Sequence, residues 1–144
     1  MAKMKKKRSA KAKGIAICAI CAAAVALAIG VNYLVALRSY VRDVSAIQVQ
    51  SVDLTTIKDG EYFGGADVGF ISARVRVVVE NHTIAELELL EHNHDRGEAA
   101  SVLPDRMLEE QRIDVDAVSG ATNSSKVIQE AVYNALTGER TIRQ

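Results

Sequence analysis

The chain has 144 residues, which is enough for one domain of ordinary size. Its formal net charge is zero, yet seven of the 18 basic residues lie in residues 1–13 beside no acidic residue, so the remainder holds 11 basic and 18 acidic residues. This acidic remainder argues against nucleic acid as a partner, because it would repel the phosphates.

Residues 14–37 contain no charged side chain and predict a transmembrane helix. A stretch of 24 residues at about 1.5 Å per residue spans roughly 36 Å, which exceeds a hydrocarbon thickness of about 30 Å. The basic segment 1–13 predicts that the N-terminus stays in the cytoplasm and that the rest of the chain lies outside the cell membrane. The alternative is a cleaved signal peptide, whose apolar region would be shorter, at about 7–15 residues.

Two cysteines lie inside this apolar stretch. The spacing of Cys18 and Cys21 also occurs in redox pairs and in metal half-sites. A metal would need further buried ligands, which the apolar stretch does not offer. We therefore interpret both cysteines as small apolar residues of a membrane helix. No cysteine follows them, so no disulfide is expected in the outer part of the chain.

Residues 38–54 mix scattered apolar residues with polar ones. They predict a helical extension, or stalk, that leads to an extracytoplasmic domain at residues 55–140. Within this domain, residues 61–63 predict a short strand, and the pair Gly64-Gly65 is expected to end or bend it.

From Phe70 to Glu80, apolar and polar residues alternate, which predicts a strand with one buried face. Asn81-His82 then predicts a hairpin turn to a partner strand at Thr83 to Glu91. A sheet that is wet on one face favours an antiparallel arrangement. The side chains expected to point inward are Ile71, Ala73, Val75, Val77 and Val79 in the first strand and Ala85, Leu87 and Leu89 in the second, with Glu86 and Glu88 outward.

Residues 92–97 break the alternation and predict a loop. Helical character resumes at residues 98–102, and Pro104 suits the first turn of a helix that ends near Arg112. Residues 124–136 have apolar side chains at helical spacing. Strands followed by helices predict an α+β fold, in which a small antiparallel sheet has helices packed on one face and is preceded by one N-terminal transmembrane helix.

The segment Asp116 to Ser125 reads Asp-Ala-Val-Ser-Gly-Ala-Thr-Asn-Ser-Ser and stands at the start of the last predicted helix. The first N–H groups of a helix have no partner within it, and the helix dipole favours negative charge there. Hydroxyl groups beside the flexible Gly120 therefore predict a seat for a phosphate. The alternative is that these polar side chains only cap the helix, because Ser, Thr and Asn are favoured at caps.

The order Asp-x-x-Ser-Gly-Ala-Thr, with the two serines that follow, resembles the attachment motif of the FMN-binding domain family. That family includes the flavin-bearing subunits of Rnf complexes and of sodium-translocating NADH:quinone reductases, and small membrane-anchored or secreted bacterial flavoproteins. The resemblance covers roughly residues 59–136. It implies that Thr122 carries FMN through a phosphoester bond. It also implies a separate flavin transferase that uses FAD and a divalent metal, which agrees with the weak nucleophilicity of a lone hydroxyl.

The other motif residues are expected to support the phosphate. Gly120 permits close approach of the backbone. Ser119, Ser124 and Ser125 are expected to donate hydrogen bonds to phosphate oxygens. Asp116 would repel a phosphate, so we expect its carboxylate to point away and to hold the loop by accepting backbone N–H bonds.

His92, His94 and Asp95 offer possible metal ligands, because His-x-His on a strand places both rings on one side. No cysteine or third clustered histidine follows, so no metal site is predicted. In the family, this loop approaches the flavin, often with a nearby glycine, which implies that His94 and Gly97 line the ring site. A solvated loop without a role is the alternative. The predicted cofactor-binding residues are Thr122, Ser119, Gly120, Ala121, Asp116, Ser124, Ser125, His94 and Gly97.

These features predict a membrane-anchored extracytoplasmic flavoprotein that carries FMN as an electron carrier rather than as a stand-alone catalyst, so no catalytic residue is assigned. Its expected partners are the flavin transferase, a membrane electron donor, an unknown acceptor and the lipid bilayer. Two other classes stay open, a noncovalent FMN-binding sensor or storage module and a cofactor-free structural ectodomain.

Overall fold

The computed structural model describes residues 2–94 and 96–138, with side chains from Gly14 onward. The chain divides into two compact units, Met1–Arg38 and Ser39–Gln144. Asp95 and the end of the predicted domain at residue 140 lie outside the described residues.

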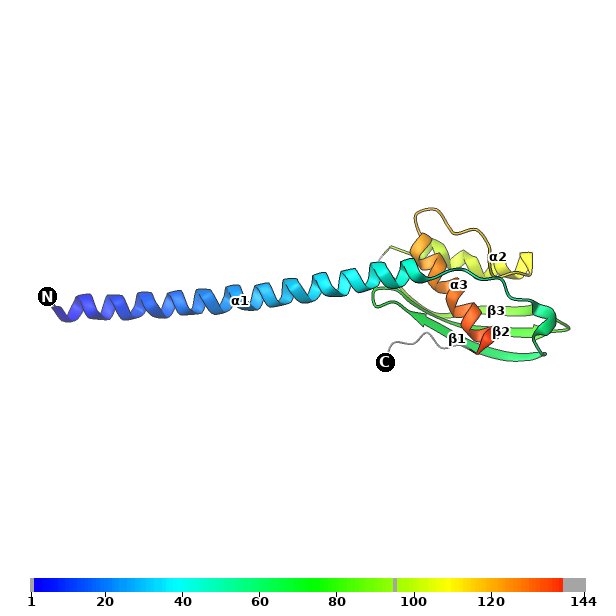
Figure 1. Cartoon of the computed structure of the whole chain (residues 1–144), viewed down its shortest axis with the longest axis horizontal. Coiled ribbons are helices and arrows are strands. Elements are labelled where there is room, and N and C mark those ends of the chain that lie inside the picture. The colour runs from blue at the N-terminus through cyan, green and yellow to red at the C-terminus, as the bar shows by residue number, and fades with distance from the viewer. Residues whose placement is uncertain (1, 95, 139–144) are drawn as a thin grey trace. The chain divides into compact units, whose positions relative to one another are not determined.

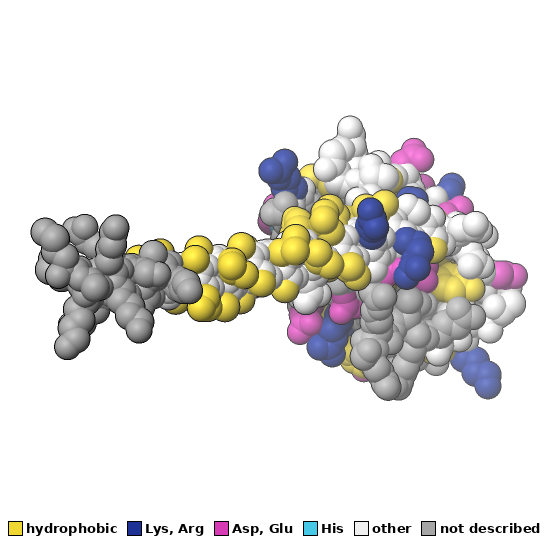
Figure 2. All heavy atoms as spheres, turned by 60° about the vertical axis from the view of Figure 1, so that its left-hand side comes forward, with side chains coloured by type: hydrophobic (Ala, Val, Ile, Leu, Met, Phe, Trp, Pro, Cys, Tyr) yellow, Lys and Arg dark blue, Asp and Glu magenta, His cyan; other side chains and the backbone are white. Residues whose placement is uncertain are grey.

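Helix α1 runs from Ala2 to Ala46 (Figure 1). From Gly14 onward it is long and apolar enough to cross a membrane, as the sequence predicts. Its large apolar side chains in residues 14–37 are exposed, and Figure 2 shows several of them on the face in view. A helix that is apolar on all sides is stable where its surroundings are also apolar. No helix boundary separates residues 14–37 from the predicted stalk, because α1 continues to Ala46.

The second unit contains one antiparallel sheet in the order β1-β2-β3, with β1 at Gly60–Asp67, β2 at Ser72–Glu80 and β3 at Thr83–Asn93. The predicted hairpin turn is confirmed. Asn81 and His82 both adopt positive φ, at 49° and 61°, as a two-residue turn between twisted strands requires.

The predicted inward face of β2 is confirmed, because Ala73, Val75, Val77 and Val79 are buried, as is Ile71 just before the strand. In β3 the prediction for Ala85 is wrong, because Ala85 is exposed and Ile84 is buried instead. The register passes from Val78 opposite Glu86 to Val79 opposite Ile84, so Ala85 forms a β-bulge. A bulge inserts one unpaired residue and so reverses the faces of the residues beyond it.

We expected Gly64-Gly65 to end or bend the first strand. The strand does not end there, because β1 continues to Asp67. The role of Gly64 is close contact with α3, the helix at Thr122–Thr137. A Cβ at Gly64 would lie 2.3 Å from the Ala131 carbonyl oxygen and 2.4 Å from the Ala135 nitrogen. These are backbone atoms that cannot rotate away, so a side chain at this position would push α3 off the sheet.

The other helical segments among the described residues are the 3-10 helices η1 at Leu54–Thr56 and η2 at Glu98–Val102, and α2 at Leu103–Glu110. Pro104 lies in the first turn of α2, as predicted, and Met107 is fully buried. Figure 1 shows α2 and α3 lying over the sheet, with α3 against β1 and β2 and α2 against β3. The predicted α+β fold is therefore confirmed.

At Ile84, the free edge of β3 is paired with a side chain rather than with another strand. Gln111 adopts φ 53° at the end of α2. Its side-chain Oε1 accepts from the Ile84 N–H at 2.8 Å, and its Nε2 donates to the Ile84 carbonyl at 2.9 Å. The amide group thus reproduces the pair of hydrogen bonds that a neighbouring strand would make, which satisfies backbone groups that are costly to leave unpaired.

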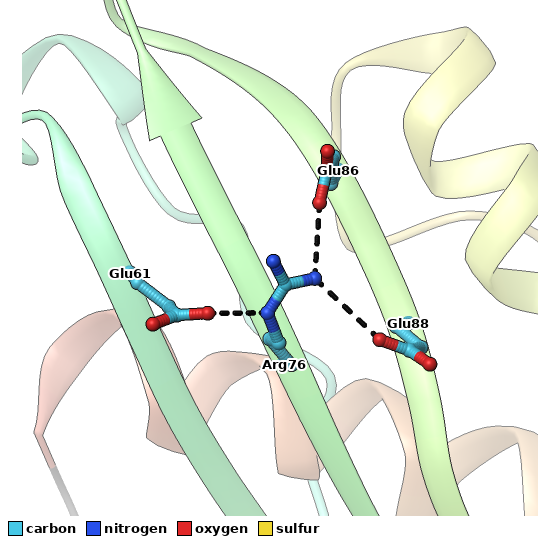
Figure 3. A network of polar contacts seen from close by, with 4 residues as sticks. All are labelled: Glu61, Arg76, Glu86 and Glu88. Atoms are coloured by element: carbon cyan, nitrogen blue, oxygen red, sulfur yellow. Dashed lines mark hydrogen bonds and ion pairs between the residues drawn. The ribbon is translucent and has the colours of Figure 1, made fainter.

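The outer face of the sheet is polar, as the alternation predicts. Arg76 at its centre forms ion pairs with Glu61 of β1 and with Glu86 and Glu88 of β3, the last two at 2.9 and 3.5 Å (Figure 3). These carboxylates are exposed, so each pair contributes little to stability. Their effect is to keep this face of the sheet soluble, while the opposite face carries the helices.

Candidate functional site

The motif begins with a tight turn directly before α3. The Ala121 N–H donates to the Val118 carbonyl at 3.0 Å, and Gly120 between them has φ 80°. Positive φ at this place in a β-turn favours glycine, because other residues are strained there. The turn leaves Ser119 and Gly120 exposed and buries Ala121.

A buried hydroxyl holds this turn against the helix. The Ser125 Oγ donates to the Ala121 carbonyl at 2.9 Å and accepts from the Val118 N–H at 3.0 Å. Its proton is therefore already engaged. Asp116, which we expected to hold the loop, is exposed and accepts no hydrogen bond within the described part of the chain. Ser125 performs the structural task that the sequence reading gave to Asp116.

The start of α3 has no side-chain cap. Its N-cap residue is Ala121, and no side chain accepts a hydrogen bond from the first turn. The interpretation that the motif only caps the helix is therefore wrong. Thr122 is the first residue of α3 and is exposed. An exposed hydroxyl beside uncapped N–H groups and the positive end of a 16-residue helix is suited to an anion such as a phosphate.

The Ser124 side chain points away from Thr122 and from the anion site proposed at the start of α3. Two residues along a helix turn the direction of the side chain by about 200°, so Ser124 and Thr122 lie on opposite sides of α3. The Ser124 side chain is 1% exposed, and its Oγ has no hydrogen-bond partner. It packs against Gly97, where an added Cβ would lie only 1.8 Å from the Ser124 Oγ.

The loop before η2 lies beside this serine. The Gly97 N–H donates to the His94 Nδ1 at 3.0 Å, and the His94 Nε2 lies 3.2 Å from the Glu98 carboxylate. Gly97 is thus brought against the beginning of α3, and His94 lies beside Gly97; both were predicted to belong to the site. His94 already has partners for both ring nitrogens.

His92 is the less expected member of this group. The predicted loop at His92 is wrong at its start, because β3 continues to Asn93 and His92 pairs with Ala73. The rings of His92 and His94 are 4.4 Å apart, centroid to centroid. Both ring nitrogens of His92 are buried without a hydrogen-bond partner. Burial, and then the neighbouring His94, lower the pKa of His92 and favour its neutral form.

Two further residues near Thr122 were missed in the sequence. Lys126 follows Thr122 by four residues, so it lies on the same side of α3, and it is partly buried. The Asn123 Nδ2 donates to the hydroxyl of Tyr40 at 2.9 Å. The spacing of Lys126 is visible in the sequence, whereas the contact with Tyr40 joins segments 83 residues apart and has no local signal.

A separate groove of about 560 Å³ lies along β1 and the C-terminal half of α3. Its lining includes Phe63, Gly65, Arg74 and Asn134 and contains none of the predicted cofactor residues. No cluster of three or more metal-ligating side chains occurs among the described residues.

Residues 69–137 match the model of the FMN-binding domain family. This part of the chain belongs to that family. The match extends from the turn before β2 to the last residue of α3 and includes the whole motif. No curated protein matches the chain. FMN is accordingly the cofactor of this domain.

The residues of the FMN-binding domain fit this cofactor on two observations. The uncapped start of α3 with the exposed Thr122 suits the phosphate end of FMN. Ser124, on the other side of the same helix end, has a buried Oγ without a partner, and both ring nitrogens of His92, whose ring lies beside that of His94, are likewise buried without partners. Buried polar groups without partners are uncommon in stable folds. These atoms can therefore still form hydrogen bonds with a bound group.

Proposed function

We propose that this protein is a membrane-anchored flavoprotein in which Thr122 carries FMN through a phosphoester bond and which acts as an electron carrier. The observation that carries the proposal is the exposed Thr122 hydroxyl at the uncapped start of α3, within an FMN-binding domain. Bound FMN supplies the redox chemistry, while the protein supplies anchorage and orientation.

Three residues have defined tasks in this proposal. Gly120 keeps the turn open so that the N–H groups of the first turn of α3 face the phosphate. Lys126, on the same side of the helix as Thr122, places a positive charge near the phosphate. Ser125 fixes the turn to the helix through its two hydrogen bonds.

Attachment requires a second protein. As the Thr122 oxygen forms the ester, its hydroxyl proton must be accepted by a base, and a hydroxyl without one is unreactive at neutral pH. No hydrogen bond links the Thr122 hydroxyl to a carboxylate or an imidazole among the residues that the structure describes. A flavin transferase therefore supplies the base and the donor FAD. The Thr122 oxygen bonds to the phosphorus of the FMN unit as the pyrophosphate bond of FAD breaks, and AMP leaves.

The membrane orientation is part of the proposal. α1 is apolar enough to span a bilayer, and the basic residues 1–13 precede the apolar stretch. Because basic flanks tend to stay in the cytoplasm, this order supports a location of the FMN-binding domain on the outer side. A covalent bond has a clear advantage there, because a cofactor lost outside the cell is not readily replaced.

The test is co-expression of the full chain with a flavin transferase, followed by denaturing gel electrophoresis and intact mass measurement. The wild-type band should fluoresce, and its mass should rise by one FMN unit. Thr122→Ala should lose both signals. Thr137→Ala is the matched control, because Thr137 is an exposed threonine at the other end of the same helix and should leave both signals unchanged.

Three other outcomes are distinguishable. Covalent label retained in Thr122→Ala would move the attachment to another hydroxyl, and the exposed Ser119 would be tested before the buried Ser124. Flavin that copurifies but is lost on denaturation would support the noncovalent sensor or storage module. A colourless protein that takes up no FMN would support the cofactor-free ectodomain.

A further inference from the structure

The first residues of the second unit pack against the beginning of α3. The Tyr40 hydroxyl accepts a hydrogen bond from Asn123, the residue next to Thr122, and the Tyr40 ring meets Phe70 edge-on at 5.4 Å between centroids. One turn further along, Val44 is 4% exposed and belongs to the hydrophobic core. Within this unit, the chain therefore enters the domain beside the motif.

We propose that the domain rests with its motif end on the phospholipid headgroup layer, so that Thr122 is held at the membrane surface. A flavin carried there would exchange electrons with a partner whose redox group also lies at the membrane surface rather than in bulk solution. The placement of Thr122 does not depend on the flavin; it rests on the membrane anchor of the proposed function, and the statement about the redox partner rests on the proposed role as an electron carrier.

Chain connectivity keeps the Tyr40 contact close to the end of the apolar stretch. Tyr40 follows Leu37, the last residue of the uncharged stretch, by three residues. Three residues span about 5 Å as helix and at most about 11 Å when extended. The headgroup region on each side of a bilayer is about 5–8 Å thick. Whatever direction the preceding segment takes, the residue that contacts Asn123 is therefore tethered within about 11 Å of the hydrocarbon boundary, in or just beyond the headgroup layer.

The side chains around this contact suit a lipid interface. Phe70 is 42% exposed and Val41 is 54% exposed, while Arg42, two residues after Tyr40 and so on the opposite side of α1, is also exposed. Tyrosine is enriched where the hydrocarbon meets the headgroups, since its ring is apolar and its hydroxyl is polar. Arginine can extend its charged end to the phosphates while its aliphatic part stays against apolar surface. The combination of exposed apolar residues, a tyrosine and an arginine fits phospholipid headgroups.

The test uses the full chain in phosphatidylcholine vesicles with a fluorescent dye in place of the flavin. Cys18→Ala and Cys21→Ala remove the native thiols, and Thr122→Cys provides the labelling site. Thr137→Cys, at the other end of α3, is the matched control, about 22 Å away at the rise of a helix. Nitroxide groups attached to the lipid headgroups quench dyes that they can approach. Quenching at position 122 should be several-fold stronger than at position 137.

A second variant tests whether the short connection to the membrane helix, rather than binding of the dye itself to lipid, causes the quenching at position 122. A flexible Gly/Ser linker of about ten residues inserted between Arg38 and Ser39 has a mean end-to-end distance of about 16–19 Å. If the short connection holds Thr122 at the surface, the linker should lower the quenching at position 122 toward the value at position 137. Equal quenching at both positions, or stronger quenching at position 137, would overturn the proposal. Because the dye replaces FMN, this result is independent of whether Thr122 is ever flavinylated.

Discussion

Replacing Gly97 with alanine tests whether the loop before η2 fixes the position of the motif helix. The added Cβ would lie 1.8 Å from the Ser124 Oγ, 2.7 Å from the Ser124 Cβ and 3.1 Å from the His94 Cβ. The Ser124 hydroxyl can rotate away, but its Cβ is attached rigidly to the backbone of α3. The substitution must therefore move the loop or the first turn of α3.

The size of the effect follows from these distances. Carbon atoms in contact are ordinarily about 3.5–4.0 Å apart, so the Ser124 Cβ must move by about 1 Å. Inserting a methyl group into a packed site costs about 1–3 kcal/mol. A cost of about 2 kcal/mol lowers the melting temperature of a domain of this size by about 8–16 °C. Flavin attachment should fall as well, because the displaced turn carries Thr122.

A double-mutant cycle separates this clash from a general loss of stability. Ser124→Gly removes both atoms that the new Cβ would meet, at a cost of about 1 kcal/mol for glycine in a helix. Thermal unfolding followed by circular dichroism should show that Gly97→Ala with Ser124→Gly is less destabilised than the sum of the single variants, by more than about 0.5 kcal/mol, the limit for independent sites. Strict additivity, or a Gly97→Ala variant that melts like wild type, would refute the direct contact.

Three further predictions concern the sheet and its histidine. Gly64→Ala should destabilise the domain in thermal melts far more than Gly65→Ala, because the new Cβ meets α3 backbone at 2.3 Å in the first case and one carbonyl at 3.3 Å in the second. Gln111→Ala should cost about 1–3 kcal/mol in urea unfolding, since it leaves the N–H and carbonyl of Ile84 unpaired. The lowered pKa of His92 means that the folded state binds fewer protons than the unfolded state, so stability should be retained above about pH 6.5 and lost as the pH falls below it. Urea unfolding at pH 7.5 and 5.0 should show a larger loss for wild type than for His92→Gln, and equal losses would exclude this coupling.

The parts of the fold that follow a regular period could be predicted from the sequence. The alternation through β2, the hairpin turn at Asn81-His82 and the helical spacing of α3 each depend on residues close in the chain. The bulge at Ala85 could not, because both registers of β3 offer apolar side chains to the core and the packing decides between them. The contact of Gly64 with α3 joins elements about 70 residues apart. Neighbouring residues carry no signal of such a contact, so the glycine was interpreted as the end or a bend of the strand.

The candidate site divides in the same way. Thr122 and its turn could be recognised because the motif is contiguous. Gly120 also signals a turn, since glycine adopts the positive φ that the turn requires. His92 was assigned to a loop because the polar run at residues 92–97 hides the last residues of β3. The contact between Asn123 and Tyr40 depends on how a distant segment packs, which no periodicity records.

Helical geometry gives the hydroxyl groups of the motif different tasks. Ser125 and Ser124 are buried, the first bonded to the turn and the second packed on Gly97, while Thr122 is exposed at the start of the helix. A side chain that is buried against Gly97 or already donates its proton is a poor acceptor for a transferred group. Ser119 is also exposed, but it precedes Gly120 in the turn and lies outside the helix. Thr122 alone among these four combines exposure with a place in the first turn of α3, where the N–H groups and the dipole stabilise an attached phosphate.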